Sequence, residues 1–117
     1  IIKTIGDAVM AVFPTMVQAL SAAIAIQREG PKDQVIKCGV HAGSALAIEA
    51  NGQVDYFGHT VNVAARTQSK SDGGDIVLAE SFLADTGVQA LLSGLPCMPF
   101  VTEFKGVGAT RLIRVQV

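Results

Sequence analysis

Short apolar runs separated by turn-forming residues divide the chain into strands and helices. Residues 1–5 (IIKTI) and 8–13 (AVMAVF) predict two strands, and Gly6-Asp7 between them predicts a tight turn. We therefore expect the segment to open in a β-hairpin. A start inside a hairpin, with no preceding helix, is unusual for a complete domain, so we also expect the segment to be part of a larger domain.

The next apolar pattern predicts a helix from Thr15 to about Arg28. Residues 15–18 (TMVQ) fit the T-x-x-Q capping box, in which side chains bind free backbone N–H groups at the start of a helix. Apolar positions then recur at helical spacing, and Gly30-Pro31 ends the pattern.

In the remaining residues, apolar runs again alternate with turn-forming residues. Asn51-Gly52 and residues 71–75 (SDGGD) are turn and loop signals, and Gly87 is a candidate break in the third helix. We expect strands at 35–43, 44–50, 76–79, 99–105 and 110–117, and helices at about 58–69 and 80–92.

The predicted order is β-β-α-β-β-α-β-α-β-β. Helices interleaved with hairpins indicate an α+β fold, in which a mostly antiparallel sheet is flanked by helices. A chain of 117 residues can form one core, so we expect a single domain over residues 1–117.

Composition narrows the classes of partner. Half of the chain is hydrophobic and 16% is charged, which excludes a disordered chain. The net charge of −1 and the absence of Trp argue against a nucleic-acid polymer as partner. Cys38 and Cys97 lack metal-type spacing, so we expect free thiols and a cytoplasmic location.

The uncharged residues 8–27 could indicate a membrane span. Pro14 and Thr15 interrupt this run, and Gln18 and Ser21 add polarity. A strand followed by a separate helix fits better, and the N-terminus lacks the cationic region of a signal peptide. We expect no membrane contact by this segment.

The predicted helix at 58–69 carries an amide and a guanidinium on one face. Asn62 and Arg66 are four residues apart, which places them roughly 6 Å from each other on one side of a helix. They are either a pair facing water or part of a phosphate site. Arginine suits phosphate because its planar fork is permanently charged.

Four further residues allow two interpretations each. Asp7 is either a turn former or a carboxylate that binds a hard cation such as Mg²⁺. Lys3 is either a solvated strand residue or a ligand contact, and Asp55 is either a loop carboxylate or a helix-terminus partner. Lys105, before Gly106-x-Gly108, precedes either a plain hairpin turn or a loop that admits a phosphate chain.

The two histidines, His41 and His59, could titrate near neutral pH, but we expect structural roles for both. The sequence contains no Ser/His/Asp order, phosphate-binding G-x-x-x-x-G-K motif or zinc-type Cys/His spacing. One carboxylate, two lysines, an arginine and an asparagine fit an enzyme that acts on nucleotide phosphates, with half of its site missing.

Five motifs in order resemble the catalytic domain of class III nucleotidyl cyclases, the adenylate and guanylate cyclases, and bacterial members most of all. The similarity covers essentially the whole chain, and the five motifs read KTIGDAVMAVF, GVHAG, DYFGHTVNVAARTQ, GGDIVLAE and FKGVG. Each motif alone is weak, whereas five in this order are specific. The stretch after GVHAG lacks the glycine-rich tail common in the family, although some bacterial members look like this.

The resemblance implies a ferredoxin-like cyclase core and assigns roles to matching residues. Lys3 and Asp55 match the base-recognising pair, of the adenine-selecting type; guanylate cyclases typically carry Glu and Cys there. Asn62 matches the asparagine that positions the ribose. Arg66 matches the arginine that stabilises the transition state, and Lys105 matches the triphosphate-binding lysine.

The resemblance also implies two Mg²⁺ or Mn²⁺ ions held by two aspartates. Asp7 matches the second aspartate, and the first belongs to a strand upstream of this segment. We therefore expect the segment alone to be inactive. The implied parent enzyme is a head-to-tail homodimer that converts ATP to 3′,5′-cyclic AMP and pyrophosphate in signal transduction.

Two other interpretations remain at this point. A catalytically silent cyclase-like domain could serve dimerisation or regulation, although retention of all six matching residues counts against it. An unrelated ferredoxin-like binding domain would leave the co-occurrence of those residues unexplained.

Overall fold

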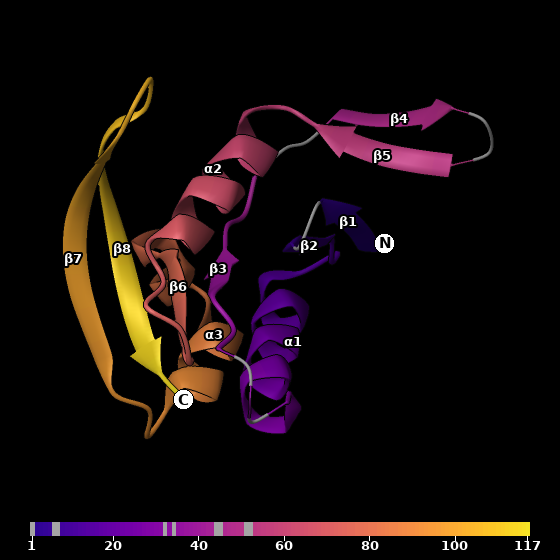
Figure 1. Cartoon of the computed structure of the whole chain (residues 1–117). Helices are drawn as coiled ribbons and strands as arrows, with labels where there is room; N and C mark the ends of the chain where they lie inside the picture. The colour runs from indigo at the N-terminus through magenta and orange to yellow at the C-terminus, as the bar shows by residue number, and fades with distance from the viewer. Residues whose placement is uncertain (1, 6–7, 32, 34, 44–45, 51–52) are drawn as a thin grey trace.

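The computed structural model describes the backbone of residues 2–5, 8–31, 33, 35–43, 46–50 and 53–117, and side-chain environments for 9–31, 33, 35–43 and 58–117 (Figure 1). The elements in chain order are β1 (Ile2–Ile5), β2 (Ala8–Ala11), α1 (Met16–Glu29), β3 (Cys38–Val40), β4 (Leu46–Ala50), β5 (Gln53–Phe57), α2 (His59–Ser69), β6 (Asp75–Ala79), the 3₁₀ helix η1 (Glu80–Ala84), α3 (Thr86–Leu92), β7 (Cys97–Phe104) and β8 (Gly108–Gln116).

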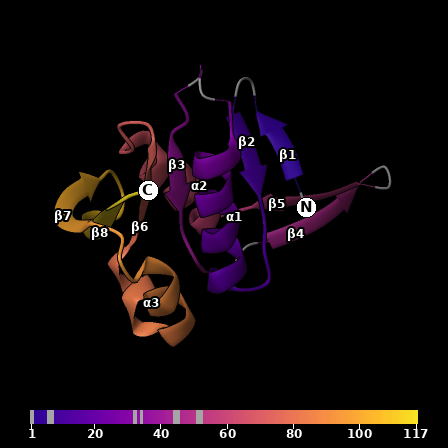
Figure 2. The ribbon, with the colours of Figure 1, turned by 90° about the horizontal axis from the view of Figure 1, so that it is seen from below.

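A four-stranded sheet in the order β3-β6-β8-β7 forms the centre of the domain. β3 runs parallel to β6, and the other two neighbouring pairs are antiparallel. In the view of Figure 2 these strands follow one another from β7 at the left to β3, and α3 lies to one side of them. β1-β2 and β4-β5 form two separate antiparallel pairs, and the β4–β5 hairpin projects away from the central sheet (Figure 1).

Helices cover both faces of the central sheet. Successive strand residues point to opposite faces, and β6 is buried along its whole length. Ile76 and Leu78 of β6 therefore pack with α1 and α3, whereas Val77 packs with Val63 of α2. This arrangement confirms the expected α+β fold with a mostly antiparallel sheet flanked by helices.

The predicted start of α1 is confirmed in detail. Thr15 is the N-cap, and its hydroxyl accepts the Gln18 backbone N–H at 3.1 Å. Leu20, Ala23 and Ile24 are the buried residues of the helix, at the predicted spacing. Such a cap contributes about 1 kcal/mol to stability.

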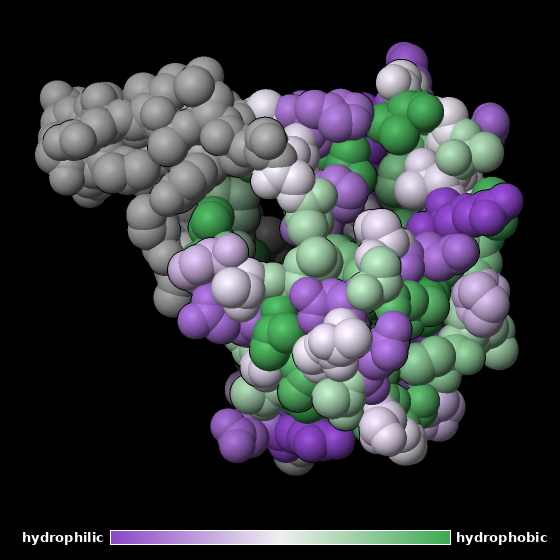
Figure 3. Space-filling model, turned by 180° about the vertical axis from the view of Figure 1, so that it is seen from behind, coloured by the Kyte–Doolittle hydropathy of each residue, from purple (hydrophilic) through white to green (hydrophobic). Residues whose placement is uncertain are grey.

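The strand hairpin expected at the start of the chain is also confirmed, because β1 and β2 pair antiparallel with Ile5 opposite Ala8. None of the helices among the described residues has the length and hydropathy needed to span a bilayer. Cys38 and Cys97 are free thiols, as expected. On the face seen in Figure 3, hydrophilic and hydrophobic residues are interspersed over the described surface.

Several element boundaries differ from the sequence predictions. Residues 53–57, which we did not predict as a strand, form β5 opposite β4. The helix expected over 80–92 is instead a 3₁₀ turn and a separate helix, and the break lies at Asp85, not Gly87. Asp85 caps α3 by accepting the Val88 N–H at 3.0 Å, which explains the break. β7 starts at Cys97 and includes Pro99, two residues earlier than expected.

Candidate active site

The helix α2 presents Asn62 and Arg66 on one side, as predicted. Val63 and Thr67 are its buried residues, and Thr67 satisfies its hydroxyl by donating to the Val63 carbonyl at 2.7 Å. Asn62 is exposed and Arg66 is half-buried. The buried pair fixes which face packs inward, so the polar pair lies one turn apart on the accessible side.

β3 and the segment that follows it lie directly against α2, and glycine at two positions allows this close approach. A Cβ on Gly39 would stand 2.2 Å from the Gln68 backbone nitrogen, and one on Gly43 would stand 2.6 Å from the Thr60 hydroxyl oxygen. The two glycines of GVHAG therefore approach opposite ends of α2. We recognised this motif in the sequence, but its packing role follows only from the structure.

Arg66 reaches the turn that carries Lys105. Its guanidinium Nη1 donates to the backbone carbonyl of Lys105, the residue that follows β7. A guanidinium has five N–H donors, so this contact leaves others available. Lys105 itself is exposed. Arg66 and Lys105, which are far apart in the sequence, are thus brought together, and both are candidate site residues predicted from the sequence.

The other three predicted residues are only partly described. Lys3 lies in β1, opposite Met10, which confirms the predicted strand. Asp55 lies in β5, opposite Ile48, so it is a strand residue and not a loop residue. We did not predict this strand, which forms because β4 provides a partner for it. Asp7 lies outside the described residues.

The described residues do not provide a metal centre. No group of three or more His, Cys, Asp or Glu side chains in that part of the chain is arranged to hold a metal ion. Asp7, the candidate ligand, is not among them.

His41 lies just after β3, beside the N-terminal end of α2. Burial lowers the pKa of His41, and the nearby His59 lowers it further. The His41 Nδ1 atom is buried without a hydrogen-bond partner among the described residues. His59 is the first residue of α2, which confirms its predicted position at the start of a helix. The neutral form of His41 suits this enclosed position.

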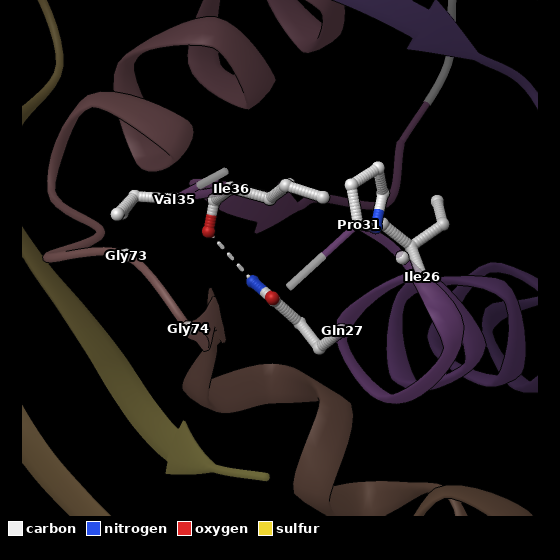
Figure 4. A pocket seen from close by; sticks show the side chains of 8 residues that line it. Ile26, Gln27, Pro31, Val35, Ile36, Gly73 and Gly74 are labelled. Atoms are coloured by element: carbon white, nitrogen blue, oxygen red, sulfur yellow. Dashed lines mark hydrogen bonds between the residues drawn. The ribbon is translucent and has the colours of Figure 1, made fainter. Parts of the chain in front are cut away.

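Two hollows on the described surface lie away from Asn62 and Arg66. One, of about 230 Å³, lies between the end of α1 and the start of β6. There the Gln27 amide donates to the Ile36 carbonyl at 2.8 Å (Figure 4) and to the Asp75 carbonyl at 2.7 Å. The other hollow lies beside η1 and the β7–β8 turn. Neither is lined by Asn62 or Arg66.

Sequence comparison identifies relatives of the chain. One is a protein from Rhizobium meliloti (strain 1021) named "Putative adenylate cyclase 3", 32% identical over 89 residues, which cover 68% of this chain and 14% of the relative. Another is an adenylate cyclase from Podospora anserina, 29% identical over 112 residues, which cover 72% of this chain and 5% of the relative. The chain thus spans a small fraction of the length of these proteins.

Structural comparison agrees with the fold. The crystal structure of an adenylate/guanylate cyclase/hydrolase from Silicibacter pomeroyi superposes with a TM-score of 0.71 at 24% identity, over 99% of this chain and 72% of that one. The family model of the adenylate and guanylate cyclase catalytic domain matches residues 1–87. Since that match covers well over half of the 117 residues, the chain belongs to the adenylate and guanylate cyclase catalytic domain family.

Proposed function

We propose that this domain converts ATP to 3′,5′-cyclic AMP and pyrophosphate at the interface of a head-to-tail homodimer. Family membership supports the reaction class. The observation that carries the residue assignment is the contact between Arg66 and the Lys105 backbone, beside Asn62 on the same face of α2. The candidate ribose, transition-state and triphosphate residues thus lie on one side of the molecule.

The proposed chemistry requires an in-line attack. The ribose 3′-oxygen forms a bond to the α-phosphorus and loses its proton to water. The bond between the α-phosphorus and the oxygen that bridges to the β-phosphate breaks, and pyrophosphate leaves. Negative charge grows on the phosphoryl and leaving oxygens. Arg66 offers a fixed cationic fork to those oxygens, which stabilises the transition state more than the ground state.

Asn62 supplies the geometry for this attack. Its amide, one helical turn before Arg66, can hold the ribose so that the 3′-oxygen faces the α-phosphate. Lys105 can neutralise the triphosphate from the turn after β7. The two divalent ions implied by the family remain part of the proposal, with Asp7 as one ligand.

Lys3 and Asp55 are the proposed base-recognition pair. Lys3 donates to an adenine ring nitrogen, and Asp55 accepts from the 6-amino group. Guanine has a carbonyl at that position, which would leave two acceptors facing each other. We therefore propose ATP rather than GTP as the substrate.

The homodimer is proposed from the exposure of the candidate residues on a single copy. Asn62 is exposed, Arg66 is half-buried and neither lines the two hollows described above, so we infer that one copy of the described residues does not enclose a nucleotide. A two-fold head-to-tail pair would enclose it twice and create two identical sites. We place the domain in the cytoplasm, where ATP is available, and propose that residues 1–117 form the C-terminal portion of one catalytic domain.

The direct test is a cyclase assay of the full-length protein with ATP, GTP and Mn²⁺. We expect cyclic AMP as the main product. Arg66→Ala should lower kcat by about 10²- to 10³-fold, the scale seen when one transition-state donor is removed. The control Arg111→Ala removes an exposed arginine from β8 and should leave the rate unchanged. A folded wild-type protein that makes no cyclic nucleotide would support the silent dimerisation or regulatory module instead.

A further inference from the structure

The loop that follows α2 is organised by a buried carboxylate. Asp75, the first residue of β6, is 1% exposed. Its carboxylate accepts the Ser71 hydroxyl and the backbone N–H groups of Asp72 at 3.2 Å and Gly73 at 3.3 Å. These bonds fix the loop directly after the helix that carries Asn62 and Arg66.

One guanidinium joins this loop to the end of α2. Arg114 Nη2 donates to the Lys70 carbonyl at 2.6 Å, and Nε lies 3.0 Å from Asp75 Oδ2 as an ion pair without hydrogen-bond alignment. Nη1 lies 3.5 Å from Asp72 Oδ2. Lys70 is the C-cap of α2, where carbonyls lack partners within the helix. Arg114 thus binds the helix end and the start of β6 at once.

Arg114 is itself held in place by the sheet. It lies in β8 between β6 and β7, opposite Val77 and Met98. Its side chain is 22% exposed, and its guanidinium lies over the Phe100 ring at 4.8 Å from the centroid. Phe100 in turn packs on the cluster that includes Val63 of α2. Arg114 is therefore held by its place in β8 and by the Phe100 ring of β7, and it connects this part of the sheet to α2.

We propose that Arg114 is a positioning residue for the candidate catalytic helix. It fixes the C-terminal end of α2 one turn beyond Arg66, while the Arg66 contact with Lys105 attaches the same helix to the tip of the β7–β8 hairpin. Arg114 acts through α2, because its Nη2 donates to the Lys70 carbonyl and its charge pairs with Asp72 and Asp75. This inference rests on the proposed cyclase function for its kinetic consequence, but not for its structural one.

Lysine cannot replace this arginine. A guanidinium presents donors in a fixed planar fork, whereas an ammonium is a single point charge on a flexible chain. Arg114→Lys would keep a counter-charge near Asp75 and lose the simultaneous bond to the Lys70 carbonyl. Displacing a catalytic group by about 1 Å can lower a rate by about 10²-fold. Arg114→Lys therefore distinguishes the effect of the positive charge near Asp75 from the effect of the bond that positions the end of α2.

The kinetic test compares Arg114→Lys and Arg114→Met with the control Arg111→Met in the full-length protein. We expect kcat to fall about 10- to 100-fold in both Arg114 variants at a temperature where circular dichroism shows full folding. KM should change little, because the proposed base and triphosphate contacts lie outside α2. In an Arg66→Lys background, Arg114→Met should have little further effect, since both act through one helix.

A structural test runs in parallel. Arg114→Met should speed hydrogen exchange of the amides in the last turn of α2, and Arg111→Met should not. Wild-type kcat in folded Arg114→Met, or exchange equal to that of the control, would overturn the positioning role. If the wild-type protein makes no cyclic nucleotide, the proposed function fails, while the exchange measurement still decides whether Arg114 holds α2.

Discussion

The close approach of α2 to β3 makes Gly39→Ala a sharp test of how the candidate helix is placed. The new Cβ would lie 2.2 Å from the Gln68 nitrogen and 2.4 Å from the Gln68 Cα, where ordinary contact begins at 3.4 Å. These neighbours are backbone atoms, which cannot rotate away. Gly39 also pairs with Val77 in β6, so β3 cannot easily retreat.

The distances from the new Cβ to Gln68 indicate how far α2 would have to move away from β3 in Gly39→Ala. About 1.2 Å separates the contact that Gly39→Ala would create from an ordinary one. Overpacking of this kind typically costs about 1–3 kcal/mol of unfolding free energy. A shift of about 1 Å in α2 would also move Asn62 and Arg66 and lower kcat by about 10²-fold.

The assay compares kcat and thermal unfolding of Gly39→Ala with those of Gly43→Ala. At Gly43 the nearest atom is the Thr60 hydroxyl oxygen at 2.6 Å, which belongs to a side chain and can give way more easily. We expect the Gly43 variant to be the milder of the two in both measurements. A folded Gly39→Ala protein with wild-type kcat and melting temperature would show that this contact does not place α2.

Three further predictions concern specificity, assembly and pH. Lys3→Glu combined with Asp55→Cys should relax or invert the preference for ATP, and equal use of GTP by the wild-type full-length enzyme would refute the assignment of this pair. Asp7→Ala and Arg66→Ala homodimers should each be nearly inactive, whereas their mixture should recover about a quarter of wild-type activity, because half of the dimers are mixed and each has one intact site. A mixture that stays inactive despite demonstrated subunit exchange would exclude the shared site. Burial lowers the pKa of His41 in the folded state, so its contribution to stability is present above about pH 6.5 and is lost as the pH falls through the folded-state pKa. Urea unfolding of His41→Asn should therefore show a weaker loss of stability at acid pH than wild type, and identical pH profiles would contradict this.

Local signals in the sequence predicted the elements that carry the candidate residues. The T-x-x-Q box located the start of α1, and small apolar residues around Asn62 located α2. Residues 53–57 were missed as a strand because the run is only 5 residues long and depends on β4 for its hydrogen bonds. A cross-strand partner is a tertiary feature, and tertiary pairing overrides local propensity in short strands.

Contacts between distant residues could not be predicted in this way. Arg66 and Lys105 are 39 positions apart, and Arg114 and Lys70 are 44 apart. Asp75 looked like one more polar residue of a loop, although it is almost fully buried. A single sequence gives no sign that an arginine near its end binds this aspartate, because only the pairing of β6 with β8 brings the two together.

The position of β7 at the end of the central sheet bears on aggregation. Its outer edge offers backbone groups to which a strand of another chain could bind, and Met98 and Val101 on it are 65% and 63% exposed. Pro99 lies in the middle of this apolar stretch and has no backbone N–H. Proline is tolerated in an edge strand where its nitrogen faces away from the paired strand, so it removes a donor from the outer edge. The same strand that supports Phe100 and Phe104 beneath α2 is thereby a poor template for intermolecular β-sheet growth.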